Sequence, residues 1–343
     1  MPEQLTFPPS RGVAPEVLDL FTGLGGLAAG FRDSGFKVVG VDNDDVSEAV
    51  YRLDELGEFR RADLAAEMVA TDAPIVIGGP PCKPWSNVNQ HRRRSAHDDH
   101  ALLDKFFDHI AAMRPELFLM ENVLGLKSDE VYQHRVKVLA KDGYAVEARI
   151  VRYSDYGAAT SRKRLFTVGV KDSVSGAAAF FDTLSRWKAP PTTVRSAIYW
   201  ARNLERGAVA DHDWSRLKTI DKYVERYRTG RFGWMKLDYD KPAPSFGSIA
   251  KTYILHPESG VDGFPVRVLS VREAMSIMGF AKTFKFPEGV ARARRYVMVA
   301  NAVSPVVSNA CAGAVKALLN AGAGQNDSER GQMMTRSRER IAE

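Results

Sequence analysis

The chain has 343 residues, of which 45% are hydrophobic and 26% charged, an ordinary globular composition that predicts one large core and two domains. Its net charge of +6 fits a polyanionic partner, although many basic proteins bind no nucleic acid. No apolar run looks long enough to cross a bilayer and no signal peptide opens the chain, so we expect a cytoplasmic protein without a membrane contact. Cys82 and Cys311 lie far apart in the sequence and in unlike surroundings, which makes a disulfide framework implausible.

Between residues 17 and 170, strand-like apolar runs alternate with helical patterns. This alternation predicts an α/β fold with a doubly wound, mostly parallel sheet. The predicted strands are Val17–Leu20, Lys37–Val41, Ile75–Ile77, Leu117–Met120, Ala145–Val151 and Leu165–Val168. The predicted helices between them are Leu24–Ser34, Asp45–Leu56, Leu102–Met113 and Glu130–Lys141.

The alternation of strand and helix patterns stops after residue 171, where basic and aromatic residues occur without a clear repeat. Order returns in a predicted helix over Ser270–Met278, because Ser270 and Glu273 form a capping-box pattern, and in a long apolar helix over Asn301–Leu319. We therefore expect a second, smaller and irregular domain. The predicted divisions are a flexible leader (1–14), a catalytic domain (15–171 and 296–321), a second domain (172–295) and a disordered tail (322–343).

A glycine-rich turn, Thr22 to Gly26, follows the first predicted strand. Such a turn lets a ligand approach the backbone closely, and Asp42, at the end of the second strand, can accept hydrogen bonds from ribose hydroxyls. The spacing of the glycines matches neither the dinucleotide-binding motif nor the P-loop motif. A cofactor in which adenosine is joined to an amino acid therefore fits better than a dinucleotide or a nucleoside triphosphate. Phe21 can stack on adenine and Asp63 can take its amino group. The alternative is that the glycines only make a tight strand-to-helix turn.

Cys82 lies in a Gly/Pro-rich loop directly after the third predicted strand, at the sheet edge where open α/β sheets bind ligands. Neighbouring Lys83 supplies positive charge, which lowers the pKa of a thiol and favours the nucleophilic thiolate. Cys311 instead lies in an apolar segment typical of a structural cysteine. Cys82 is therefore a candidate nucleophile.

Two further polar segments adjoin strands of the same predicted sheet. Glu121 ends a strand and can bind or protonate a base, although a helix-capping or ion-paired glutamate is the simpler interpretation. The basic run Ser161–Arg164 leads into the last strand, and a solvated turn is the simpler interpretation there.

Taken in order, these segments resemble the motifs of the DNA (cytosine-5)-methyltransferases. The similar stretches cover most of residues 16–318, and six motifs in the family's order are far more specific than any one alone. The matching segments are Asp19–Gly26, Pro80–Ser86, Glu121–Val123, Tyr156–Arg164, Arg267–Phe280 and Asn301–Val303.

The resemblance implies a Rossmann-like S-adenosylmethionine-dependent methyltransferase that modifies carbon 5 of a flipped-out cytosine in a specific duplex DNA sequence. It implies catalytic roles for Cys82, which attacks carbon 6, and for Glu121, which binds ring nitrogen 3 and the exocyclic amine. It also implies that Arg164 holds the carbonyl oxygen of the base and that Arg162 helps to position the site. No metal is implied. The implied S-adenosylmethionine contacts are Phe21, Thr22, Gly23, Gly25, Gly26, Asp42, Asn43, Asp63, Leu64, Pro80, Asn301, Ala302 and Val303.

The same resemblance makes the stretch 83–100 a polar loop that closes over DNA, and the middle region a target-recognition domain. Arginine reads guanine edges, and lysine or arginine holds phosphates. A solvated surface loop is the simpler interpretation of residues 83–100, and Trp234 is expected in the core. The implied DNA contacts are Lys83, Ser86, Asn87, Gln90, Arg92, Arg93, Arg228 and Arg231.

Some positions depart from the family pattern without removing the catalytic groups. Lys83 replaces the usual Gln, Ala300 replaces a Gly and can narrow the methionine end of the cofactor site, and Ser304 replaces a Pro. Two alternatives remain, namely a transfer-RNA cytosine-5 methyltransferase and a catalytically silent DNA-binding relative. The expected partners are duplex DNA and a cognate restriction endonuclease, the expected state is a monomer, and the target sequence cannot be read from one chain.

Overall fold

The computed structural model describes residues 16–81, 98–173, 176–215, 235–247, 249 and 253–320. The predicted leader and tail, Cys82 and all eight predicted DNA contacts lie outside these residues.

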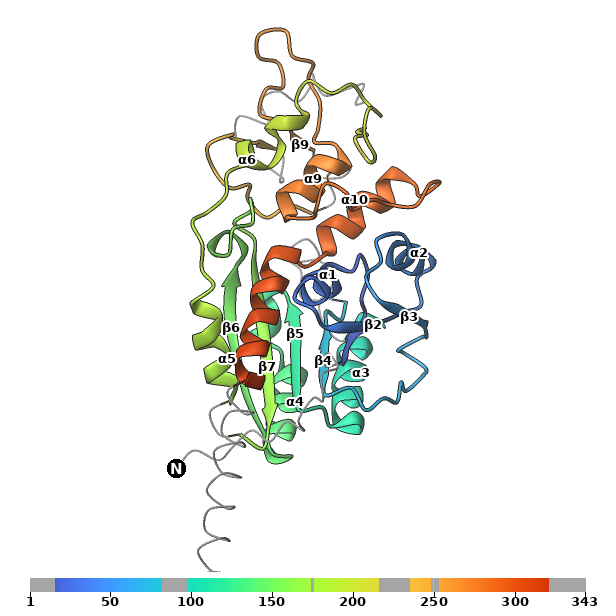
Figure 1. The fold of residues 1–343 in the computed structure, drawn as a ribbon, viewed down its shortest axis with the longest axis vertical. Coiled ribbons are helices and arrows are strands. Elements are labelled where there is room, and N and C mark those ends of the chain that lie inside the picture. The colour runs from blue at the N-terminus through green and yellow to red at the C-terminus, as the bar shows by residue number, and fades with distance from the viewer. Residues whose placement is uncertain are drawn as a thin grey trace, which may run out of the picture.

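The fold is built on a seven-stranded sheet with the order β3-β2-β1-β4-β5-β7-β6 (Figure 1). The first five of these strands are parallel, whereas β7 runs antiparallel to both β5 and β6. The prediction of a doubly wound, mostly parallel sheet is thereby confirmed. The strands are β1 (Glu16–Leu20), β2 (Lys37–Asp42), β3 (Glu58–Arg61), β4 (Ile75–Gly78), β5 (Leu117–Asn122), β6 (Tyr144–Arg152) and β7 (Lys163–Lys171).

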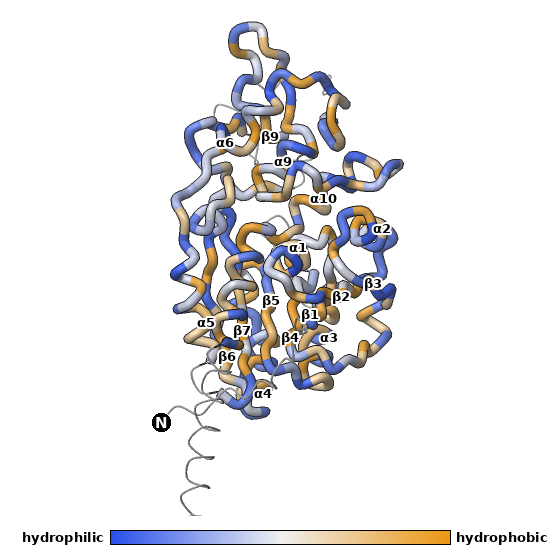
Figure 2. The backbone as a smooth tube through the Cα atoms, viewed as in Figure 1, coloured by the Kyte–Doolittle hydropathy of each residue, from blue (hydrophilic) through white to orange (hydrophobic). Residues whose placement is uncertain are grey.

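Alternate side chains of each strand enter two separate cores, one on each face of the sheet. In β1, Val17 packs into the first core, whereas Leu18 and Leu20 pack into the second. Figure 2 shows the hydrophobic residues concentrated along the strands. The first core is covered by α1 (Gly26–Asp33), α2 (Asp45–Leu53), α5 (Gly176–Ser185) and a helix over 305–320, and the second by α3 (Asp98–Met113) and α4 (Glu130–Lys141).

Helix α5 falls within the stretch that the sequence assigns to the second domain. Its apolar side chains Phe180, Phe181 and Leu184 nevertheless share the first core with Val168 and Val170 of β7. The chain therefore leaves the sheet body only after α5, and the division of the chain into domains stays a prediction.

The predicted helix over Asn301–Leu319 is wrong at its start. Helix α10 (Arg292–Asn301) ends at Asn301, Ala302 is extended, and a new helix covers 305–320. The span Arg292–Asn320 is long and apolar enough to cross a bilayer, contrary to the expectation from the sequence, but 72% of its most apolar window is buried. The burial of Cys311, Val315 and Leu318 in the first core identifies a core helix instead.

A second lobe lies beyond one end of the sheet, with α9 and α10 between the sheet body and the rest of this lobe (Figure 1). The predicted capping box of Ser270 and Glu273 is present at the start of α9. Both carboxylate oxygens of Glu273 accept hydrogen bonds from buried Arg267, at 2.7 and 2.8 Å. The elements of this lobe are α6 (Val194–Ile198), η5 (Tyr199–Ala201), β8 (Met235–Lys236), β9 (Ile254–Leu255) and α9 (Val271–Met278).

Candidate active site

A cavity of about 640 Å³ opens at the carboxyl edge of the sheet, where the strand ends of β1, β2, β4 and β5 meet. Almost every predicted site residue that the structure describes lines this cavity, although these residues are distant from one another in the sequence. The predicted residues that line it are Phe21, Thr22, Gly23, Gly26, Asp42, Asn43, Asp63, Leu64, Pro80, Glu121, Arg162, Arg164, Asn301, Ala302 and Val303.

The glycine turn that starts α1 serves both packing and ligand access. Gly25 does not line the cavity, because a Cβ there would lie 2.3 Å from Leu56 Cδ1, on the packed side of the turn. A Cβ on Gly26 would lie 2.0 Å from the carbonyl oxygen of Val303. Gly23 has a φ of +53°, and a Cβ there would meet nothing closer than 4.0 Å. Gly23 therefore leaves the cavity open, and the other two glycines permit close packing beneath it.

Asp42 is fixed at the end of β2 by two backbone donors. Its Oδ2 accepts a hydrogen bond from Gly23 N at 2.9 Å, and its Oδ1 accepts one from Asp44 N at 3.1 Å. Burial raises the pKa of Asp42, and these two hydrogen bonds oppose that rise. The carboxylate thus links the glycine turn to the start of α2 and faces the cavity.

Asp19, which sequence analysis did not single out as a site residue, lies under the same turn. Its Oδ2 accepts hydrogen bonds from Thr22 Oγ1 at 2.6 Å and from the Tyr51 hydroxyl at 3.2 Å. Burial raises the pKa of Asp19 to about 7. Sequence analysis places Asp19 in the predicted strand Val17–Leu20 and at the start of the first motif, but its hydrogen bonds to Thr22 and Tyr51 are seen only in the structure.

Glu121 lies at the end of β5, on the opposite side of the cavity from Asp42. Its Oε1 accepts a hydrogen bond from the Tyr153 hydroxyl at 3.1 Å and pairs with Arg164 Nε at 3.1 Å. The next residue, Asn122, donates to the Pro80 carbonyl oxygen at 3.1 Å. The carboxylate is therefore held by two other segments, and the neighbouring Asn122 ties the end of β5 to the loop that leads to Cys82.

Arg162 connects the start of β7 to the end of α10. Its Nη1 donates to the carbonyl oxygen of Ala300 at 2.6 Å, and its guanidinium lies 5.9 Å from the ring centroid of Tyr153. Ala300 does not line the cavity, and its contribution to the site is this carbonyl oxygen. The side chain of Arg162 is buried, so its charge acts inside the wall.

Helix α10 supplies a wall of the cavity, of which the sequence predicted only Asn301. Arg294, Val297, Met298 and Asn301 follow the spacing of one helical face and all line the cavity. Arg294 Nη2 contacts both carboxylate oxygens of Asp44 at 2.8 Å. The helical spacing of these four residues is visible in the sequence, but it was missed because the helix was predicted to begin at Asn301.

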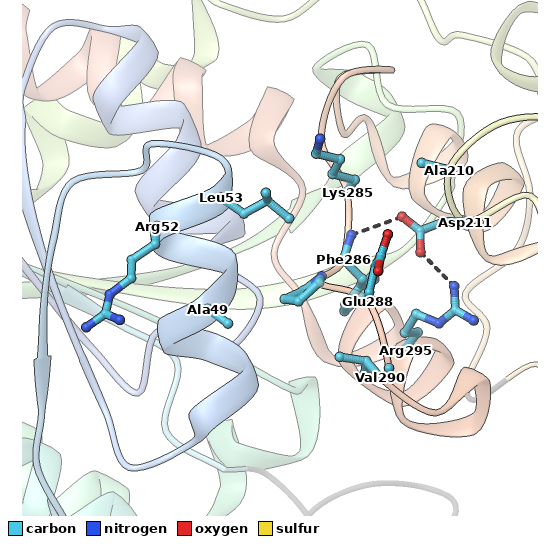
Figure 3. A pocket seen from close by; sticks show the side chains of 12 residues that line it. Ala49, Arg52, Leu53, Ala210, Asp211, Lys285, Phe286, Glu288, Val290 and Arg295 are labelled. Carbon is cyan, nitrogen blue, oxygen red and sulfur yellow. Dashed lines mark hydrogen bonds and ion pairs between the residues drawn. The ribbon is translucent and has the colours of Figure 1, made fainter.

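A larger cavity of about 920 Å³ lies between α2 and the segment 285–290 (Figure 3). None of the predicted site residues in the described part of the chain lines it. Its carboxylate Asp211 is already engaged by Arg295 at 2.7 Å and by the backbone N–H of Phe286 at 3.0 Å. We therefore assign the candidate active site to the smaller cavity.

The predicted nucleophile Cys82 lies outside the described residues, and the chain is described up to Pro81, which lines the cavity. Among the described residues, no group of three or more His, Cys, Asp or Glu side chains forms a metal site.

Comparison with known proteins gives the chain's relatives. Residues 16–317 match the family described as C-5 cytosine-specific DNA methylase. The chain is 27% identical over 328 residues to the type II methyltransferase M.FnuDI of Fusobacterium nucleatum, covering 84% of this chain and 90% of that protein. It is 26% identical over 336 residues to the type II methyltransferase M.NgoPII of Neisseria gonorrhoeae, covering 89% and 96%.

Solved structures agree with the fold. A putative DNA modification methyltransferase encoded within an Escherichia coli prophage superposes with a TM-score of 0.67 at 22% identity, over 90% of this chain and all of that one. The Dnmt2 methyltransferase of S. pombe superposes with a TM-score of 0.66 at 14% identity, over 90% of this chain and 98% of that one.

Proposed function

Because the chain belongs to the C-5 cytosine-specific DNA methylase family and is a DNA (cytosine-5)-methyltransferase, we propose that it uses S-adenosylmethionine and a covalent Cys82 adduct. The observation that carries the proposal is one cavity in which the glycine turn and Asp42 face Glu121 and Arg164. The loop of Pro80 and Pro81 leads from this cavity towards Cys82.

The cavity fits the proposed cofactor in size and in chemistry. Its volume of about 640 Å³ is within the range of roughly 300–1,000 Å³ of small-molecule sites. In this proposal Asp42 accepts the ribose hydroxyls, Asp63 the adenine amino group, and Phe21 stacks on the adenine, while Asn301–Val303 close the opposite wall. When bound, S-adenosylmethionine supplies the methyl group.

Cys82 acts as the nucleophile in the proposed mechanism. Its thiolate adds to carbon 6 of cytosine, which turns the ring into an enamine whose carbon 5 takes the methyl group. Water or another base takes the carbon 5 proton, and departure of the thiolate restores the aromatic ring.

Glu121 accepts a hydrogen bond from the exocyclic amine and shares a proton with ring nitrogen 3, and this proton stabilises the negative charge that develops on the ring as the thiolate adds. Tyr153 and Arg164 support this role because both contact Glu121 Oε1 and fix its orientation. Arg164 also holds the carbonyl oxygen of the base, and Arg162 positions the wall behind it.

The target base must leave the helix, because a stacked cytosine cannot reach a cavity at the sheet edge. Extrusion costs a few kcal/mol, roughly, and needs contacts that replace the lost stacking. We assign this role to the polar loop after Cys82 and sequence recognition to the part of the region 172–295 that follows α5. The DNA contacts proposed in this region, Arg228 and Arg231, are inferred from the sequence alone.

The named relatives are type II methyltransferases. We therefore propose a role in a restriction–modification system, with a cognate endonuclease acting on the same DNA site, a monomeric enzyme and a cytoplasmic location.

The decisive experiment is trapping on duplex DNA that contains 5-fluorocytosine. The wild type should form a denaturation-resistant adduct in the presence of S-adenosylmethionine, and Cys82→Ser should form none while still binding the cofactor. Adduct formation by the serine variant would overturn the nucleophile assignment. Tritium transfer to duplex DNA and to transfer RNA, measured in parallel, identifies the substrate, and label in transfer RNA alone would refute the DNA assignment.

A further inference from the structure

Arg294 joins α10 to the start of α2 in the wall of the candidate active site (Figure 1). The helical spacing of Arg294, Met298 and Asn301 brings these three side chains to the cavity. Arg294 Nη2 lies 2.8 Å from both carboxylate oxygens of Asp44 and 3.1 Å from Asp45 Oδ1. One guanidinium nitrogen therefore ties together two parts of the cavity wall that are 250 positions apart in the sequence.

Asp44 links this arginine to the carboxylate at the end of β2. Its Oδ1 caps α2 by accepting hydrogen bonds from Val46 N at 2.7 Å and Ser47 N at 3.2 Å, and its own backbone N–H donates to Asp42 Oδ1 at 3.1 Å. Partial burial alone would raise the pKa of Asp44, but the hydrogen bonds from Arg294 and the two backbone N–H groups outweigh it and hold that pKa below its usual value. Arg294, Asp44 and Asp42 thus form a connected series.

Three acids are crowded into the connection 42–45 between β2 and α2, namely Asp42, Asp44 and Asp45. Burial is the main reason that the pKa of Asp42 is raised, and the charge of Asp44 adds to the rise. A cation beside Asp44 and Asp45 offsets this like-charge repulsion. Arg294 therefore favours the ionised form of Asp42 and also holds the connection against α10.

We propose that Arg294 is a positioning residue that acts through Asp44 and holds Asp42 ready to accept the ribose hydroxyls of the cofactor. The inference rests on the proposed function, which places the ribose at Asp42. Without Arg294 the connection 42–45 would populate other arrangements, and the apparent affinity for the cofactor would fall in proportion to the competent fraction. The Arg294 side chain is 45% exposed, and such ion pairs contribute little to folding, so the loss should appear in ligand affinity rather than in stability.

The proposal predicts which kinetic quantity changes. Arg294→Ala should weaken the binding of S-adenosylmethionine about threefold to tenfold, the order expected for a networked ion pair, and should leave kcat at saturating cofactor close to that of the wild type. S-adenosylhomocysteine carries the same ribose, so its affinity should fall by the same factor. Salt screens a partly exposed pair, so the wild type and Arg294→Ala should converge as the ionic strength rises.

Two further variants separate the charge from the shape of the side chains. Arg294 makes its three contacts through one nitrogen and so acts as a point charge, which means that Arg294→Lys should restore part of the affinity. Asp44→Asn keeps the cap of α2, because asparagine caps a helix as well as aspartate does, but removes the charge that Arg294 contacts. The double variant Asp44→Asn/Arg294→Ala should bind no more weakly than Arg294→Ala alone, because the two residues act as one unit.

Arg135 on α4 offers a matched control. Its Nε lies 2.7 Å from Asp104 and its Nη2 lies 2.9 Å from Asp108, so it too joins its helix to two acids of another helix, α3. It lines neither of the two cavities described above. Arg135→Ala should therefore leave the affinity for both ligands unchanged, at a cost in urea stability similar to that of Arg294→Ala.

The experiment is isothermal titration calorimetry of S-adenosylmethionine and S-adenosylhomocysteine against each variant between about 50 and 500 mM salt, with circular dichroism to verify folding. An unchanged affinity in folded Arg294→Ala would overturn the inference. Equal weakening by Arg135→Ala, a loss confined to S-adenosylmethionine, or effects that add in the double variant would overturn it as well. Failure of the wild type to bind either ligand would instead refute the proposed function.

Discussion

The same substitution at two buried glutamates should separate catalysis from folding. Glu121→Gln alters the cavity, whereas Glu273→Gln alters the ion pair under α9. Each change removes one charge and preserves the shape of the side chain. The surroundings differ, because Arg164 beside Glu121 is partly exposed at the cavity and Arg267 beside Glu273 is buried.

For Glu121→Gln we expect a large loss of activity and a small loss of stability. The amide oxygen can still accept the Tyr153 hydroxyl, and water can solvate Arg164, so the free energy of unfolding should fall by about 1 kcal/mol. The lost carboxylate charge should lower kcat by roughly 10²–10³, as removal of one stabilising group does in other active sites.

For Glu273→Gln we expect the reverse pattern. Burial alone would raise the pKa of Glu273, but the hydrogen bonds and charge of Arg267 outweigh it and hold that pKa below its usual value. Leaving Arg267 buried without its carboxylate should lower the free energy of unfolding by about 3–5 kcal/mol. At a temperature where the variant is folded, kcat should be close to that of the wild type.

Urea denaturation monitored by tryptophan fluorescence suits this comparison, because the ring of Trp214 lies 4.6 Å from the Arg267 guanidinium. Methylation is measured by tritium transfer to duplex DNA under saturating cofactor. The reasoning would be refuted if Glu121→Gln retained activity within tenfold of the wild type. It would also be refuted if the two variants lost equal stability.

Three further changes test other parts of the structure. Asp42→Ala should weaken S-adenosylmethionine binding about tenfold or more in calorimetry, and an unchanged affinity would remove Asp42 from the ribose site. Gly26→Ala should lower the free energy of unfolding by about 1–3 kcal/mol in urea, because its Cβ would lie 2.0 Å from the Val303 carbonyl oxygen, and a neutral effect would contradict that close approach. Exchange of residues 186–265 for those of a relative should change the methylated sequence found by bisulfite sequencing, whereas identical sites would place recognition elsewhere.

The sheet was predictable because most of its strands are apolar runs buried on both faces. Five of the seven strands have that pattern, and β6 was also predicted although most of its residues are only partly buried, whereas β3, Glu-Phe-Arg-Arg, was missed. This strand is at the edge of the sheet and its one apolar residue, Phe59, is only partly buried, so it lacks the apolar run that identifies the others.

The site was predictable where its residues end strands, because the carboxyl ends of parallel strands meet at one edge. Asp42 and Glu121 were found in this way. Arg294 and Asp19 were not, because their roles depend on packing between distant segments. Arg294 contributes only because α10 returns over the start of α2, and Asp19 is fixed by a hydrogen bond from Tyr51 of α2.

The wall contributed by α10 also has a consequence for synthesis on the ribosome. The glycine turn emerges early, but the cavity lacks the side chains of Arg294–Val303 until nearly the whole fold has been translated. A chain terminated within the second lobe would carry the glycine turn and Glu121 without that wall. Premature termination should therefore yield an inert fragment, and methylating activity should appear only with almost complete products.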